Sequence, residues 1–287
     1  MTGETSSVII DDNLYVAGEA NTDTYKYSFN NSKWTTVAKR TYAGNHQNAF
    51  VLNGEWWLVG GIDANSYGKV QIYNPTQNKW RENPSLPWDG GSVCVTLINK
   101  VIYACGGVWL FNNGQNGGGT NTTNKCAKFD TSSSSNKWEM LGNMPYRRNH
   151  AATGQDDQGQ MWIIGGREGK NVPSNGFPTI QIYNPSTNKW VTSNDTDSKL
   201  EVMPIGRGGT GHAVYNNGKF YVFGGETGNN PGGYATPNKV YNRTDIYDTS
   251  TNKWSSGKVM PHPRHGLFPV LYKDAIYIAG GGLHNGY

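Results

Sequence analysis

Arginine and histidine side chains recur at short spacing along the chain, and a few carboxylates accompany them. Guanidinium groups bind planar anions through paired hydrogen bonds, and imidazoles exchange a proton near neutral pH. Gathered in one pocket, such groups would suit a carboxylate, a phosphate or the hydroxyls of a sugar. The candidate ligand-binding residues are Arg40, His46, Arg148, His150, Arg167, Arg207, His212, Glu226, Arg264 and His265.

The short motifs of common catalytic and metal sites are missing from the sequence. It contains no Gly-x-Ser-x-Gly, no phosphate-binding loop and no His-Glu-x-x-His. The histidines have none of the short-range spacings that are typical of metal ligands. From the sequence we therefore assign no catalytic residue, no metal ligand and no cofactor.

The composition favours a chain of many short strands. Charged residues make up 16% of the sequence, against about 25% in an average soluble protein. Glycine is frequent, with 38 residues, and so is tryptophan, with 10, while the helix formers Leu, Glu and Ala are scarce. This pattern argues against helical bundles and doubly wound α/β folds.

Charge and hydropathy limit the class of partner. The net charge is +4, but Lys and Arg do not form the clustered runs of nucleic-acid-binding proteins, so we expect no nucleic acid partner. No apolar run approaches the roughly 18 residues that a membrane span needs, so we expect a soluble chain. The first residues show no signal peptide, although the polar, aromatic composition favours a secreted or cell-surface protein.

A repeated phrase organises the whole sequence. A strand-like segment that ends in a Gly pair recurs, as in Tyr221-Val222-Phe223-Gly224-Gly225. The first glycines of the copies are Gly18, Gly60, Gly106, Gly165, Gly224 and Gly280. Successive copies are between 42 residues (18 to 60) and 59 residues (106 to 165) apart, which indicates a repeat architecture.

A second phrase follows each of the first five copies and consists of an aromatic residue, a polar turn and Lys-Trp. In the fifth copy these aromatic residues are Tyr247 and Trp254. The other pairs are Tyr27 and Trp34, Tyr73 and Trp80, Phe129 and Trp138, and Tyr183 and Trp190. Each repeat thus predicts four antiparallel strands. In the fifth copy they lie near 211–216, 219–224, 243–248 and 253–257, with Asn217-Gly218 as the first hairpin turn.

A four-stranded sheet of this size has two apolar faces and cannot bury both alone. Radial stacking buries each face against a neighbouring sheet. The repeats therefore predict an all-β fold, a six-bladed β-propeller of four-stranded antiparallel blades within a single domain, 1–287. The expected blades are approximately 5–40, 41–88, 89–146, 147–205, 206–262 and an incomplete 263–287.

The Gly pair after the second strand and the Tyr-to-Trp spacing resemble kelch repeats over nearly the whole chain. The first copy departs from the pattern, with Glu19 in place of the second glycine. Kelch proteins are mostly six- or seven-bladed propellers, so the resemblance implies the same fold. It also implies a structural role for arginines before the first strand, which in kelch repeats often contact carbonyls of the adjacent blade.

In a propeller, the loops before the first strand and after the second strand share one mouth of the central channel. The candidate binding residues fall in these loops, so we expect them to converge there. Three long loops between second and third strands, 108–125, 167–178 and 226–242, contribute aromatic side chains. Trp109, Phe111, Phe177, Tyr234 and Tyr241 would either contact a partner or fold back onto the propeller.

The sixth copy lacks the aromatic-to-Trp phrase. It predicts strands near 266–271 and 275–280 and then ends at Tyr287. Either the last blade has two strands and something covers its edge, or the chain is a fragment of a longer one.

All three cysteines, Cys94, Cys105 and Cys126, fall in the third copy. A hairpin turn at Asn99-Lys100 would place Cys94 opposite Cys105, which allows a disulfide between them. The same residues would serve equally as small buried hydrophobic groups.

These features favour a non-catalytic binding propeller that recognises a protein or a glycan through a basic mouth and aromatic loops. One alternative is a sugar-modifying enzyme, because compact sialic-acid epimerases (mutarotases) resemble this chain in being kelch propellers with polar channel residues. Another is an assembly module in which a strand of another chain completes the last blade.

Overall fold

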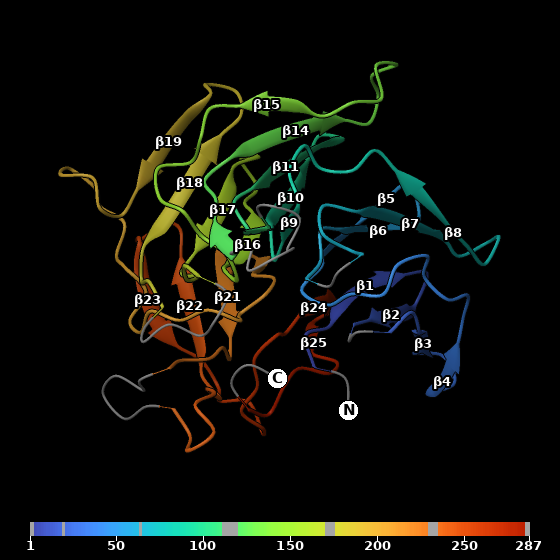
Figure 1. Cartoon of the computed structure of the whole chain (residues 1–287). Coiled ribbons are helices and arrows are strands. Elements are labelled where there is room, and N and C mark those ends of the chain that lie inside the picture. Colours follow the sequence, from blue (N-terminus) through green and yellow to red (C-terminus); the bar gives the residue numbers. More distant parts are fainter. Residues whose placement is uncertain are drawn as a thin grey trace.

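The computed structural model describes residues 3–18, 21–62, 65–110, 120–169, 176–228 and 235–284, and these contain strands and turns but no helix. None of them therefore forms a helix with the length and apolar character of a membrane span. The blades follow one another around a central axis in sequence order (Figure 1). The all-β propeller expected from the repeats is confirmed.

Five blades are antiparallel sheets of four strands in sequence order. Blade one contains β1 (Ser6–Ile10), β2 (Asn13–Ala17), β3 (Thr24–Ser28) and β4 (Lys33–Thr36). Blade two contains β5 (Asn48–Leu52), β6 (Glu55–Val59), β7 (Val70–Asn74) and β8 (Lys79–Asn83). Blade three contains β10 (Cys94–Ile98), β11 (Val101–Cys105), β14 (Cys126–Asp130) and β15 (Glu139–Leu141).

The two remaining complete blades lie on the opposite side of the ring (Figure 1). Blade four contains β16 (Ala152–Gln155), β17 (Met161–Ile164), β18 (Ile180–Asn184) and β19 (Lys189–Thr192). Blade five contains β20 (Val214–Asn216), β21 (Lys219–Phe223), β22 (Thr244–Asp248) and β23 (Lys253–Ser256). In blade five Asn216 pairs with Lys219, so the predicted turn at Asn217-Gly218 is confirmed.

The recurring aromatic-to-Trp spacing is a cross-strand pair. In blade two, Tyr73 on β7 lies opposite Trp80 on β8, with ring centroids 5.1 Å apart. Nε1 of Trp80 donates a hydrogen bond to the carbonyl of Ala38, 2.9 Å away in the preceding blade. Trp138 and Trp254 make the equivalent bond to the blades before them. Each pair therefore stabilises the outer edge of its own sheet, and these three tryptophans also tie their sheets to the preceding blades.

Apolar side chains fill the wedges between neighbouring blades. Between blades four and five, Trp162 and Ile182 meet Phe220 and Tyr247, all of which are buried. The ring centroids of Trp162 and Phe220 are 4.8 Å apart. Because each sheet buries its faces only against other blades, the blades are stable only as a ring.

The sixth blade is a two-stranded sheet of β24 (Val270–Tyr272) and β25 (Ala275–Tyr277). Both strands are shorter than the expected 266–271 and 275–280. The residues before β24 instead form a loop at the channel, where His265 bridges to Gly282.

Contacts between blades six and one close the ring. The backbone N–H of Thr5 donates to the carbonyl of Gly266 at 3.0 Å, and the Thr5 hydroxyl donates to the carbonyl of Ala279 at 2.7 Å. Farther out, the ring of Phe29 stacks on Tyr272 with centroids 4.0 Å apart. Blade one thus packs against blade six without adding a strand to it.

A small sheet at the channel mouth has no counterpart in the sequence analysis. It contains β9 (Gly90–Gly91), β12 (Val108–Leu110) and β13 (Thr120–Thr122), with β12 in the centre. A Cβ atom on Gly91 would lie 2.4 Å from the carbonyl oxygen of Gly61, so only glycine allows this close approach. Part of the long loop 108–125 is therefore ordered as sheet.

The disulfide that the sequence allows between Cys94 and Cys105 is not formed. Cys105 is bonded to Cys126, and Cys94 is a free, buried thiol. The strand register places Cys94 opposite Cys105 and Cys105 opposite Cys126, in one row across three strands. The turn at Asn99-Lys100 was enough to predict the first pairing. The pairing of Cys105 with Cys126 could not be predicted, because a long loop precedes β14 and the register of that strand does not follow from the loop length.

We expect one protected thiol in the native protein. Burial raises the pKa of Cys94 to about 11, so both access and thiolate content are low. Iodoacetamide should leave the native chain unlabelled and should label Cys94 alone after unfolding without reductant, as located by peptide mass spectrometry. Label on Cys126 under these conditions would contradict the assigned disulfide.

Candidate functional site

Six equivalent residues surround the channel axis, one shortly before the first strand of each blade. They are Glu4 (φ 47°), His46 (φ 55°), Ser92 (φ 51°), His150 (φ 54°), Gly209 (φ 68°) and Gly266 (φ 61°). Backbone N–H groups of Ser92, Gly209 and Gly266 donate to the carbonyls of His46, His150 and Gly209 at 3.1, 2.9 and 2.7 Å. This left-handed turn repeats around the axis and brings side chains of different blades together.

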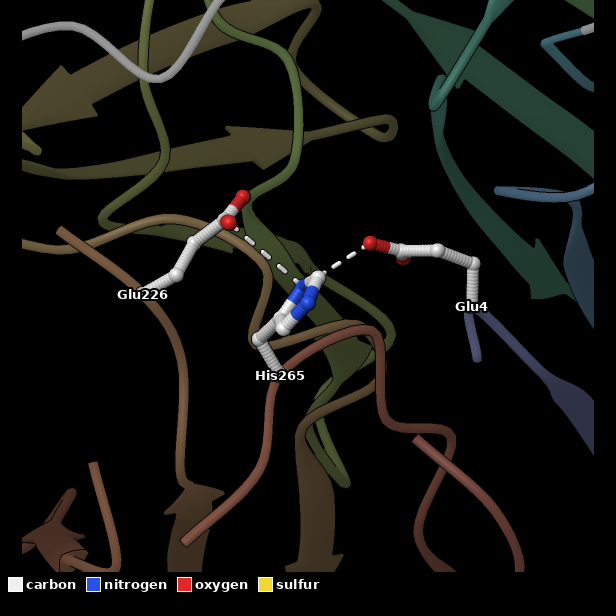
Figure 2. Close-up of side chains that lie close together, drawn as sticks. All are labelled: Glu4, Glu226 and His265. Atoms are coloured by element: carbon white, nitrogen blue, oxygen red, sulfur yellow. Dashed lines mark ion pairs between the residues drawn. The ribbon is translucent and has the colours of Figure 1, made fainter. Parts of the chain in front are cut away.

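At the centre of this ring, two glutamates and a histidine form a buried cluster (Figure 2). Nδ1 of His265 lies 2.8 Å from Oε1 of Glu4 and 3.5 Å from Oε2 of Glu226. The second oxygen of each carboxylate has its own partner. Nε2 of His46 lies 3.1 Å from Oε2 of Glu4, and Nη1 of Arg167 lies 2.7 Å from Oε1 of Glu226.

Burial and neighbouring charge act in opposite directions on Glu4. Burial alone would raise the pKa of its carboxyl group, but the imidazoles of His46 and His265 more than offset this effect. The pKa of Glu4 is therefore held well below its ordinary value, and the cluster contains a carboxylate at neutral pH.

His150 stands beside the cluster. Its ring meets that of His46 edge to face, with centroids 4.5 Å apart, and its Nδ1 lies 2.6 Å from Oδ1 of Asn149. Burial, and next the charge of Arg167, hold the pKa of His150 well below its ordinary value, so the ring is neutral. His150, His46 and Glu4 line a cavity of only about 40 Å³.

The candidate residues Arg40, Arg207 and Arg264 bind main-chain oxygens. Arg40 donates to the carbonyls of Gly44 and Gly18, and Arg264 to that of Gly280, at 3.0–3.1 Å. Arg207, which is fully buried, donates to the carbonyl of Gly224 at 2.5 Å and pairs with Asp245 at 2.7 Å. Burial lowers the pKa of Arg40 to about 10. Arg40 thus links blade one to the loop before blade two, which is the role that the kelch resemblance implied. Arg207 and Arg264 instead bind carbonyls of their own blades.

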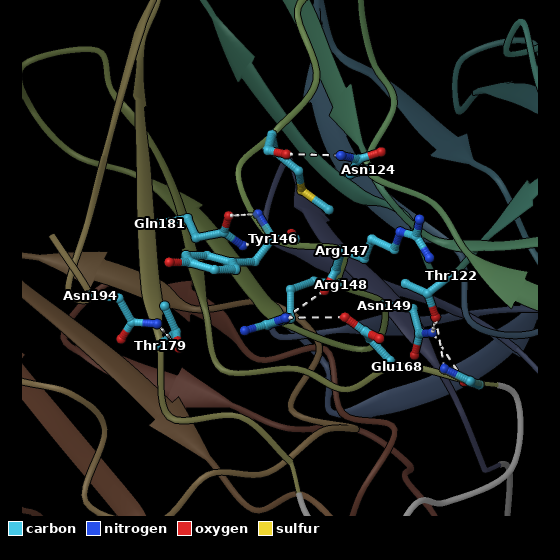
Figure 3. Close-up of polar contacts among 12 residues, drawn as sticks. Thr122, Asn124, Tyr146, Arg147, Arg148, Asn149, Glu168, Thr179, Gln181 and Asn194 are labelled. Carbon is cyan, nitrogen blue, oxygen red and sulfur yellow. Dashed lines mark hydrogen bonds and ion pairs between the residues drawn. The ribbon is translucent and has the colours of Figure 1, made fainter.

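Arg148 is buried in the loop before β16, at the channel-mouth rim of blade four (Figure 3). Its guanidinium carbon is 3.8 Å from the centroid of the Phe177 ring, and its Nη1 is 3.8 Å from Oε1 of Glu168. Burial lowers the pKa of Arg148 to about 10. The adjacent Tyr146 and Arg147 are exposed. Arg148 therefore supports the rim, and its neighbours form the surface.

His212 lies apart from the cluster. It lines a different cavity of about 430 Å³, together with Phe50, Leu97, Asp157 and Tyr215. The predicted convergence therefore covers His46, His150, Arg167, Glu226 and His265, and does not include His212.

The aromatic loop residues have differing positions. Lys125 lies 4.5 Å from the Trp109 ring at the mouth, whereas Tyr241 is buried 5.7 Å from the guanidinium carbon of Arg207. Phe111, Tyr234 and Glu19, which replaces the second glycine of the first copy, lie outside the residues that the structure describes.

Sequence reasoning missed Glu4, the residue that links His46 with His265. Glu4 occupies the same place before the first strand of blade one that His46 and His150 occupy in theirs. Alignment of the repeats on that position was the available signal, but the residue type changes from histidine to glutamate.

Acid should destabilise the fold through His212. Its ring stacks on Phe268 with centroids 5.1 Å apart, and burial lowers its pKa to about 4. Between an unfolded pKa of about 6.5 and this folded value, the unfolded chain holds a proton that the folded chain does not. The contribution of His212 to the free energy of unfolding is thus fully present well above pH 6.5. It falls by about 3 kcal/mol as the pH drops to 4.

Urea unfolding at pH 7 and pH 4 of the wild type and of His212→Gln measures this contribution. Both proteins should become less stable at pH 4, since other groups such as His150 still titrate. The fall in the free energy of unfolding from pH 7 to pH 4 should be at least 1 kcal/mol smaller in the variant than in the wild type. An identical pH dependence of both proteins would contradict the assignment.

Six wedge-packed blades with channel-facing loops define a β-propeller, and comparison with known proteins gives the family. Residues 92–287 match the KLHDC2/KLHL20/DRC7 Kelch-repeats domain. Kelch-like protein terF of Aspergillus terreus is 32% identical over 272 residues, covering 91% of this chain and 54% of that protein. The chain belongs to the kelch-repeat family.

Two further likenesses agree with this. Human Kelch-like protein 23 is 26% identical over 238 residues, covering 78% of this chain and 36% of that protein. The solved structure of YjhT has a TM-score of 0.78 at 20% sequence identity, covering 99% of this chain and 91% of that chain, and it shares the fold. The chain spans about half the length of terF and about one third of Kelch-like protein 23.

Proposed function

We propose that this kelch propeller is a protein-interaction module that binds an acidic segment of its partner at the channel-mouth face of blades three and four. The observation that carries this proposal is the closed state of the central cluster. Its charged groups pair with one another around a cavity of about 40 Å³, whereas binding pockets for small ligands are typically about 300–1,000 Å³. At this mouth of the channel, recognition therefore falls to the exposed rim.

The rim of blades three and four carries cationic and aromatic groups side by side. Hydrogen bonds at 2.9 and 3.2 Å between Asn124 and Met144 bring Lys125 close to the segment with Tyr146 and Arg147. Tyr146 is 38% exposed and Arg147 is also exposed. We name Trp109, Lys125, Tyr146 and Arg147 the rim patch. Aromatic and arginine side chains are the groups that most often anchor protein partners.

Peptide and glycan arrays test this proposal. Wild-type protein should be retained by peptides rich in Asp and Glu, and Arg147→Glu should weaken retention at least tenfold because it reverses a rim charge. Lys33→Glu makes the same charge change on an exposed residue of β4 and should bind as wild type does. Retention by glycans alone, or equal loss in both variants, would contradict binding of an acidic segment at the rim patch.

We further propose that the edge of β25 accepts additional strands of the kelch type. A cavity of about 530 Å³ beside this edge is lined by Phe223, Met260, Ile276 and Ile278. In blade four the third strand, β18, contributes Ile180 and Ile182 to the apolar cluster shared with blade five. Blade six has no such strand among the described residues, and an open edge with adjoining apolar side chains favours strand addition.

A synthetic peptide of residues 243–257, which spans β22 and β23, is a suitable probe for this edge. We expect saturable binding in fluorescence anisotropy and a higher melting temperature of the protein. The same peptide with Tyr247→Asp should not bind, because the aromatic residue faces the packed side in blade five. Failure of the unmodified peptide to bind would refute strand addition at this edge.

A further inference from the structure

The donor atoms of the central cluster converge. Oε2 of Glu4 is held by His46, and Oε1 of Glu226 is held by Arg167, so each carboxylate is oriented from outside. The other oxygen of each carboxylate lies toward Nδ1 of His265 (Figure 2). One potential ligand atom from each of the three residues lies within 4.8 Å of the other two, and all three residues are buried.

An independent observation points to a guest beside Glu4 in this cluster. His150 is only 5% exposed, and its Nε2 has no hydrogen-bond partner among the residues that the structure describes. Buried polar atoms are nearly always satisfied by protein, water or an ion. The cavity that His150 shares with Glu4 and His46 measures about 40 Å³, which exceeds the roughly 10–15 Å³ that one water needs.

The charge of the cluster favours a cation. A histidine binds a metal ion in its neutral form. With both imidazoles deprotonated, the two carboxylates and the Arg167 guanidinium sum to −1. Imidazole and carboxylate donors suit Zn²⁺ and its first-row neighbours, and they do not provide the all-oxygen shell that Ca²⁺ or Mg²⁺ takes. A ligand set of three protein groups leaves a coordination position for water, beside which the unpaired nitrogen of His150 would accept a hydrogen bond.

We propose that Glu4, Glu226 and His265 bind one divalent transition-metal ion, Zn²⁺ above all, at the axis of the propeller. His46 and Arg167 are positioning residues that orient the two carboxylates. The ion joins blade one, blade five and the loop before blade six. It therefore stabilises the closure of the ring at the blade that has two strands. This role is separate from partner binding at the rim patch.

The test uses the full chain without an affinity tag, freed of metal with a chelator and then titrated with Zn²⁺ or Co²⁺. We expect about one ion per chain by elemental analysis, a melting temperature that rises with Zn²⁺, and intense visible d–d absorption with Co²⁺. Glu226→Gln should lower the affinity at least tenfold. Glu168→Gln and His262→Gln remove exposed groups of the same types outside the cluster and should leave the affinity unchanged.

If Glu226→Gln does not fold, Glu4→Gln and the Co²⁺ spectrum of the wild type decide the question. A folded wild-type chain that binds neither ion would overturn the proposal, and a protonated His265 between two carboxylates would then account for the cluster. Ions bound equally well by the wild type and both glutamine variants of the cluster would overturn it as well.

Discussion

Gly211→Ala is expected to destabilise the protein by about 2–6 kcal/mol, since overpacking and a left-handed non-glycine backbone each cost about 1–3 kcal/mol. A Cβ atom on this residue would lie 1.6 Å from the carbonyl oxygen of Leu267, and φ is +62°. The neighbour is main chain of the next blade, so it cannot turn aside as a side chain would. Urea unfolding followed by tryptophan fluorescence measures the loss.

Gly54→Ala is the matched control for this variant. Gly54 also has a left-handed backbone, with φ +74°, but a Cβ atom there would meet nothing within 4 Å. Its loss should stay near 1 kcal/mol, the cost of the conformation alone. Equal losses in the two variants would contradict the close approach of blades five and six at Gly211.

Arg207→Ala should cost about 3–5 kcal/mol, as expected when one partner of a buried ion pair is removed. Arg207 and Asp245 are both fully buried and lie 2.7 Å apart. Asp245 keeps a second partner, Arg243, at 2.6 Å, so we expect a loss near the lower end of this range. Chemical unfolding at neutral pH measures the change in the free energy of unfolding.

The control for Arg207→Ala is Arg147→Ala, which removes an exposed guanidinium from the rim patch. It should change stability by no more than about 0.5 kcal/mol. A loss below 1 kcal/mol for Arg207→Ala would contradict a structural role for this side chain, and Arg207 would again be a candidate for ligand binding.

The architecture was predictable because it repeats. The spacing of Tyr73 and Trp80 recurs in other copies, and each copy supplies independent support for a hairpin in the same register. The Gly pairs were predictable for the same reason. A Cβ atom on Gly224 would lie 2.2 Å from the carbonyl oxygen of Arg264, which shows why such positions accept only glycine.

The roles of the channel residues were less predictable because they depend on partners in other blades. Arg207 looks like a ligand-binding residue until Asp245 and the carbonyl of Gly224 are placed beside it. Glu4 has no neighbouring motif in the sequence, yet the left-handed turn before blade one brings it to His265. Contacts of this kind arise from ring closure, which no single repeat encodes.

The central claim is that the partner binds on the rim of blades three and four and not in the channel. Hydrogen exchange of backbone amides, with and without the acidic peptide retained most strongly on the array, tests it most directly. We predict protection of 120–125 and 144–149 in the wild type, and no protection in Arg147→Glu. Protection confined to 155–157 and 212–215 in the channel, or none at saturating peptide, would contradict the claim.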